Sequence, residues 1–126
     1  MKIQVAVHIE AAGTADRIKY LAFDERYKLT GVKIVDDGGI TSNGADYAVI
    51  SVFGNNGSTA AFQWSTQTGA EGALTDGVSA SLADQKSGLD IYDAGTSIKI
   101  SKTHQGTTGR PVDSMLILSF EQARKY

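Results

Sequence analysis

The chain has no cysteine and a single proline. The lack of cysteine excludes a disulfide scaffold, a thiolate metal site and a cysteine nucleophile. No apolar run approaches the roughly 18 residues of a membrane span. The first ten residues alternate between apolar and polar side chains and lack the continuous apolar core of a signal peptide. We therefore expect the protein to be made and folded in the cytoplasm, with no membrane partner.

The residues that are present describe one small globular domain. The chain has 126 residues, of which 41% are hydrophobic and 21% are charged. This is the size and composition of a single domain with one core. We expect that domain to span 1–126, with a polar C-terminal tail, 121–126, that need not be ordered. The 14 glycines predict many turns.

Charge is unevenly spread along the chain. The net charge of −2 gives no general attraction to nucleic acid or to membrane surfaces. Residues 1–33 carry six basic and four acidic side chains, 34–98 carry one basic and eight acidic, and 99–126 carry five basic and two acidic. One interpretation is that aspartates populate turns. The other is charge complementarity with a neighbouring copy or a larger partner.

Alternation of apolar and polar residues is the main structural signal. Ile3, Val5, Val7 and Ile9 alternate with polar residues, which is typical of a half-buried strand. Two apolar runs flanking the acidic, glycine-rich stretch 36–46 predict central strands. In chain order the expected strands are 2–10, 17–23, 27–35, 46–54, 58–65 with Ala60, Phe62 and Trp64 facing the core, a weak strand near 73–80, 89–92, 97–102 and 114–120.

This pattern predicts an all-β fold. About eight antiparallel strands, with turn signals roughly 8 to 15 residues apart and little or no helix, are typical of a β-sandwich. Eight strands favour a jelly roll over a seven-stranded immunoglobulin-like sandwich. Two helical alternatives remain open. One is a helix over 15–28, and the other is a short helix through Leu74, Val78 and Leu82, which are spaced by four residues.

No catalytic constellation is apparent, so we expect no enzyme and no cofactor. The two histidines, His8 and His104, have no carboxylate at a metal-ligand spacing, and we expect both to be exposed. The chain has no nucleophile elbow, P-loop or dinucleotide fingerprint.

Three binding hypotheses have weak support. Asp36, Asp37 and Asp46 could surround a calcium ion, but their spacing does not match an EF-hand loop; we favour an exposed loop tip that contacts a basic neighbour, and no metal. A nucleic-acid site would use four basic groups without interleaved aromatics: Lys99, Lys102, His104 and Arg110. A sugar-stacking platform would use five aromatics that fall mostly in apolar runs and are better interpreted as core: Tyr20, Tyr27, Tyr47, Trp64 and Tyr92.

Three segments carry a resemblance to a known family: 11–15 with 18–23; 28–35 with 40–47 and 49–52; and 93–95 with 98–100 and 106–109. Together they resemble the small decoration (cement) proteins of tailed-bacteriophage heads. These are patterns of strands and turns that cover most of the chain. One departure is Asp24-Glu25-Arg26 at a corner where such chains often carry proline.

The resemblance implies a jelly-roll β-sandwich that catalyses no reaction. Such a protein binds the outer surface of an assembled capsid and cements neighbouring capsomers, commonly as a homotrimer, so its expected partners are the major capsid protein and itself. Repeated contacts around a shell gain strength through avidity.

A carbohydrate-binding module on a virion or cell surface is the alternative function. We expect contacts at the edge of the N-terminal strand, at 66–88 and at 103–111, and the candidate interface residues are Arg17, Lys19, Asp36, Asp37, Asp46, Lys99, Lys102 and Arg110.

Overall fold

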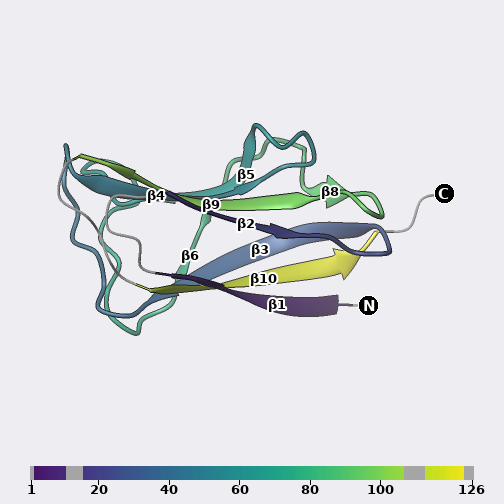
Figure 1. The fold of residues 1–126 in the computed structure, drawn as a ribbon, viewed down its shortest axis with the longest axis horizontal. Helices are drawn as coiled ribbons and strands as arrows, with labels where there is room; N and C mark the ends of the chain where they lie inside the picture. Colours follow the sequence, from purple (N-terminus) through teal and green to yellow (C-terminus); the bar gives the residue numbers. More distant parts are fainter. Residues whose placement is uncertain (1, 11–15, 107–112, 124–126) are drawn as a thin grey trace.

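The computed structural model describes residues 2–10, 16–106 and 113–123. In this part of the chain the fold is two β-sheets stacked face to face (Figure 1). It holds no helix, and hence none that could span a membrane. The ten strands are β1 (Lys2–Ile9), β2 (Arg17–Leu21), β3 (Tyr27–Asp36), β4 (Tyr47–Phe53), β5 (Ala60–Ser65), β6 (Ala80–Ser81), β7 (Ala83–Asp84), β8 (Ile91–Tyr92), β9 (Ile98–Gln105) and β10 (Ser114–Gln122).

The two sheets have five strands each. The first has the order β1-β10-β3-β6, and β8 also pairs with β3. The second has the order β2-β9-β4-β5-β7. Every strand pair is antiparallel. Strands β1 and β2 are therefore edge strands of different sheets, and Figure 1 places both at the front of the molecule.

The pairing of the strands is nested. β1 pairs with β10, β2 with β9, β3 with β8 and β4 with β5. This is the arrangement obtained when one long antiparallel hairpin rolls up into two sheets, which is a jelly roll. The predicted β-sandwich of jelly-roll type is confirmed, with two additional short strands, β6 and β7.

The core lies between the sheets and follows the alternation seen in the sequence. On β10, Leu116, Leu118 and Phe120 are at most 1% exposed, whereas Met115 faces out and is 38% exposed. The sequence predicted a strand that is apolar on both faces, and the structure covers only one of them. β3 and β9 supply further fully buried side chains, namely Leu29, Ile34, Ile98 and Ile100.

Both helical alternatives are wrong. Residues 17–21 pair with β9 as β2. Leu74 forms a β-bridge with Ile40, because its backbone N–H and C=O both bond to that residue. The weak strand expected near 73–80 is instead this bridge followed by β6.

At the C-terminus β10 continues to Gln122, so the expected tail begins later than residue 121; residues 124–126 are outside the described part.

The fifth predicted strand begins later than expected. Oδ1 of Asn56 accepts hydrogen bonds from the backbone N–H groups of Ser58 and Thr59, which extends the turn and delays β5 to Ala60. A register shift at Val52/Phe53 accompanies this turn. Phe62 faces the core as predicted, but Ala60 and Trp64 are only half-buried.

Candidate functional site

A buried polar network joins the two sheets at one end of the sandwich. Lys102 on β9 donates from Nζ to Oγ of Ser114 on β10 at 2.9 Å. Ser114 in turn donates to Oδ1 of Asp36 on β3. All three residues are at most 7% exposed. The lysine belongs to one sheet and its two partners to the other, so the network links the sheets across the core.

Burial dominates the electrostatics of this network. Loss of water raises the pKa of the Asp36 carboxyl, against the opposing effects of the Ser114 hydrogen bond and the Lys102 charge. Burial lowers the pKa of Lys102, against the attraction of Asp36 and Asp113. Oδ2 of Asp36 is also buried and accepts no hydrogen bond from the described residues. The network is therefore sensitive to the loss of either charge.

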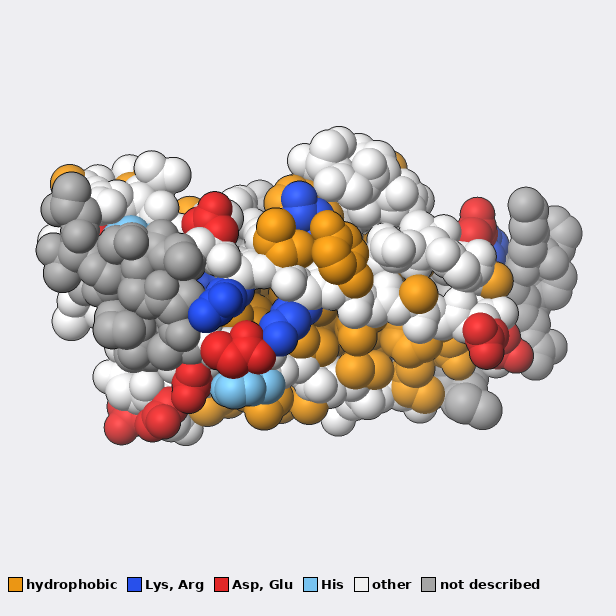
Figure 2. All heavy atoms as spheres, viewed as in Figure 1, with side chains coloured by type: hydrophobic (Ala, Val, Ile, Leu, Met, Phe, Trp, Pro, Cys, Tyr) orange, Lys and Arg blue, Asp and Glu red, His pale blue; other side chains and the backbone are white. Residues whose placement is uncertain are grey.

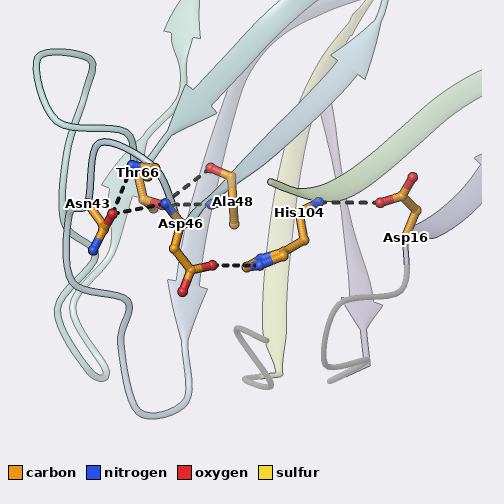
Figure 3. A network of polar contacts seen from close by, with 7 residues as sticks. Asp16, Asn43, Asp46, Ala48, Thr66 and His104 are labelled. Atoms are coloured by element: carbon orange, nitrogen blue, oxygen red, sulfur yellow. Dashed lines mark hydrogen bonds and ion pairs between the residues drawn. The ribbon is translucent and has the colours of Figure 1, made fainter. Parts of the chain in front are cut away.

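A second polar network fixes the loop between β3 and β4 (Figure 3). Nε2 of His104 lies 2.7 Å from Oδ1 of Asp46. Oδ1 of Asn43 accepts from the backbone N–H groups of Ala45 and Asp46, which closes the turn before β4. The fully buried Thr66 accepts from the backbone N–H of Ala48 at 2.9 Å. These contacts connect the loop to β4, to β9 and to the end of β5.

One expectation about this region is wrong, and another holds only in part. The His104 side chain is 4% exposed, not a surface histidine, because it packs against the Asp46 carboxylate. The loop 36–46 is an exposed tip only in part, since Asp36 is 1% and Ile40 is 4% exposed. No pattern in the sequence indicated the His104–Asp46 contact, because the two residues are 58 positions apart and meet only through the pairing of β4 with β9.

The β2 patch is a surface that combines apolar and basic side chains. Its members are Ile18 and Tyr20 on β2 and Lys99 on β9; Arg17 lies opposite the inward-facing Lys102, on the other face of β2. Ile18 is 49% and Tyr20 is 63% exposed. Tyr20 lies opposite Lys99 in the strand register, and Nζ of Lys99 is 4.9 Å from the centre of the Phe53 ring. Figure 2 shows apolar side chains beside basic ones above the middle of the view.

The acidic patch lies at the end of the first sheet, where β1 ends and β10 begins. Its members are Asp37, Asp76, Asp113 and Met115. Three segments meet here, because the backbone N–H of Asp37 donates to the Asp113 carbonyl and that of Gly38 donates to Oδ1 of Asp76. A cleft of about 390 Å³ opens between them, and among the described residues no lysine or arginine lines it. Acidic side chains gather at the lower left of Figure 2.

The candidate interface residues are dispersed by the fold. Lys99 falls in the β2 patch and Asp37 in the acidic patch, whereas Arg17 lies on the other face of β2, opposite Lys102. Lys19 donates to Oε1 of Glu10 at 2.7 Å, and this bond lowers the pKa of Glu10. Asp36 and Lys102 are buried, so neither can contact a partner directly. Asp46 contacts His104, and Arg110 lies outside the described residues.

The five aromatics of the sugar hypothesis do not form a platform. Tyr27 and Tyr92 are buried, as a core role predicts, and the Tyr92 hydroxyl donates to the Phe53 carbonyl at 2.6 Å. The half-buried Trp64 donates from its indole nitrogen to the Gly72 carbonyl. Tyr20 is the exception, since it was expected in the core and is mostly exposed. The reason is that Tyr20 lies opposite Lys99 on the outer face of its sheet, whereas its neighbours Lys19 and Leu21 lie opposite the buried Ile100 and Ile98.

No group of three or more His, Asp or Glu side chains in residues 2–10, 16–106 and 113–123 is arranged to hold a metal ion. Asp36, Asp37 and Asp46 point to different surroundings: the buried network, the acidic patch and His104. The described residues thus give no support to the calcium hypothesis.

No family model matches the chain, and no curated protein matches it. Among solved structures, the chain is similar to one from Desmodium yellow mottle tymovirus. The alignment covers 100% of this chain and 89% of that one, at 9% identity and a TM-score of 0.38. The jelly-roll assignment rests on the strand pairing described above.

Proposed function

We propose that the chain is a virion structural protein that binds the outer surface of a tailed-phage capsid and cements neighbouring capsomers, as a homotrimer. The resemblance in the sequence implies a jelly roll, and the nested pairing of the strands agrees with that implication. The proposal places the protein on the virion, with the major capsid protein and other copies of itself as partners.

The edge strands of the two sheets offer surfaces for contacts with other proteins. β1 and β2 are edge strands of different sheets on the same side of the sandwich. An edge strand leaves backbone donors and acceptors on its outer side available to another chain. Ile3 and Val5 on β1 are only half-buried, and Ile18 and Tyr20 on β2 are exposed. Extended edges with apolar side chains suit flat contacts with other proteins.

We assign the capsid contact to β1, which keeps it separate from the β2 patch. Lys2, Gln4, Ala6 and His8 alternate along β1 on its exposed face. A capsid surface that covers this strand would bury that face together with its edge.

Binding to assembled heads tests the proposed function. Heads that lack the protein are mixed with the purified chain and separated on a density gradient. We expect saturable binding, and we expect Ala6→Glu to weaken it about tenfold or more by placing a charge in the contact. Lys28→Glu, at another exposed site, on β3, should bind like the wild type. A folded wild-type chain that does not sediment with heads would overturn the proposal.

A further inference from the structure

Most sheet edges in the described part of the chain are protected against pairing with another chain. The edges formed by β6 and β8 in the first sheet and by β7 in the second have strands of only two residues. β2 has five residues, and Arg17 and Lys19 lie on its inner side, because their partners on β9 face the core. Short edge strands and inward-pointing charges are two devices that prevent edge-to-edge association.

β1 has none of these features. It has eight residues, contains no proline and pairs with β10 in one register without a shift. Its inner face is apolar throughout, with Val7 and Ile9 buried and Ile3 and Val5 only half-buried. In the part of the chain that the structure describes, β1 pairs on one side only (Figure 1). Its other side can therefore accept a further strand.

The inner face of β1 is complementary to itself in the antiparallel direction. If two copies of β1 pair in a register centred on Ala6, side chains of the same face come opposite each other. Ile3 of one copy then lies opposite Ile9 of the other, and Val5 lies opposite Val7. Apolar side chains meet only apolar side chains, and Ile3 and Val5 lose the exposure that they keep in the single chain.

The outer face of β1 matches itself in the same register. Gln4 comes opposite His8, and both side chains can form hydrogen bonds. At each end Lys2 comes opposite Glu10, the residue that follows β1, and opposite charges that face each other stabilise a strand pair. Oε1 of Glu10 accepts from Lys19 of its own copy at 2.7 Å, and a carboxylate has lone pairs for a second ammonium group.

We propose that two copies of this chain pair through β1, antiparallel and about a two-fold axis at Ala6, so that their first sheets join into one. The same strand is used on both copies, so the contact closes after two chains. The proposed capsid contact uses this strand as well, so the pair is the form of the free chain and separates when the chain binds a head. The inference thus goes beyond the proposed function, and it can be tested without heads.

Two variants with like charges test the register on the purified chain. Gln4→Lys/His8→Lys and Gln4→Glu/His8→Glu change only exposed sites of the outer face, so the fold should be retained, which far-ultraviolet circular dichroism checks. Each variant places like charges opposite each other twice, and we expect its dissociation constant to rise about tenfold or more. An equal mixture of the two places opposite charges across the pair and should associate nearly as the wild type does. Light scattering after size-exclusion chromatography measures the masses.

Lys28→Glu/Lys33→Glu is the matched control, with two charge changes at exposed sites of β3 away from the edge, and should associate like the wild type. Three outcomes would overturn the inference: a wild type whose mass is not that of a dimer, charged variants that associate like the wild type, or a mixture that associates no better than its components. A wild type that passes these tests and does not sediment with heads would overturn the proposed function alone.

Discussion

Replacing Lys102 by methionine is expected to lower the free energy of unfolding by about 3–5 kcal/mol. Asp36 would remain buried with the facing ammonium group removed, and a charge in that position is strongly unfavourable. Ser114 would lose the donor at its Oγ at the same time. Chemical denaturation at neutral pH, followed by tryptophan fluorescence of Trp64, measures the change.

The double variant Asp36→Asn/Lys102→Met separates the lost charge from the lost packing. An uncharged site of similar volume is often as stable as a buried ion pair, so we expect the double variant to recover most of the loss. Lys33→Met removes an exposed lysine of β3 and should change stability by less than about 0.5 kcal/mol. A loss below about 1 kcal/mol for Lys102→Met would show that the network does not carry a buried charge.

The same network predicts a dependence of stability on pH. Burial raises the pKa of Asp36 above its ordinary 3.8, so the folded state binds this proton more tightly than the unfolded chain does. The resulting stabilisation is complete below the unfolded pKa and is lost as the pH rises through the folded pKa. The wild type should therefore lose stability relative to the double variant as the pH rises above about 4 and through the folded pKa of Asp36.

Phe120→Ala is expected to lower the free energy of unfolding by about 3–5 kcal/mol. Phe120 is 1% exposed and its ring centre lies 4.9 Å from that of Phe23 and 6.3 Å from that of Tyr27. Phe23 and Tyr27 are themselves 5.0 Å apart, so the three rings form one cluster at the end of the core. Alanine leaves a cavity and removes two edge-on ring contacts.

Phe53→Ala is the matched control for this prediction. Phe53 is half-buried, lies outside the main core and is covered by the Lys99 side chain. Its truncation leaves a surface that water can fill, so the loss should be less than half of that for Phe120. Equal losses in the free energy of unfolding for the two variants would mean that the aromatic cluster does not stabilise the core more than a half-buried surface ring does.

The positions of the long strands could be predicted from the sequence, but their partners could not. Alternation in 2–10 and the apolar run of 114–120 define two strands by local physics, since side chains on a strand alternate between faces. Nothing local says that Lys2 pairs with Glu121 across nearly the whole chain. That pairing comes from rolling up the nested hairpin. The two-residue strand β7 was missed, and β6 only overlaps the end of the weak strand expected near 73–80, since neither is long enough to show alternation.

The candidate site was harder to predict because burial depends on position within a sheet. Tyr20 is an aromatic residue of an apolar run and is exposed because it lies on the outer face of the edge strand β2, whereas Lys102 has the charge of a surface residue and is buried because it lies on the inner face of the central strand β9. Alternation on β9 assigns Lys102 to the inner face together with Ile98 and Ile100, and this signal could have indicated a buried lysine. The meeting of Asp37, Asp76 and Asp113 required the tertiary structure.

A particle reconstruction tests the central claim most directly. In a cryo-electron microscopy map of the virion that carries this chain, the account predicts density for two stacked five-stranded sheets on the outer surface of the head, in contact with more than one capsomer and repeated around three-fold positions. Density of this shape found only in the tail, or a head surface with none, would contradict it.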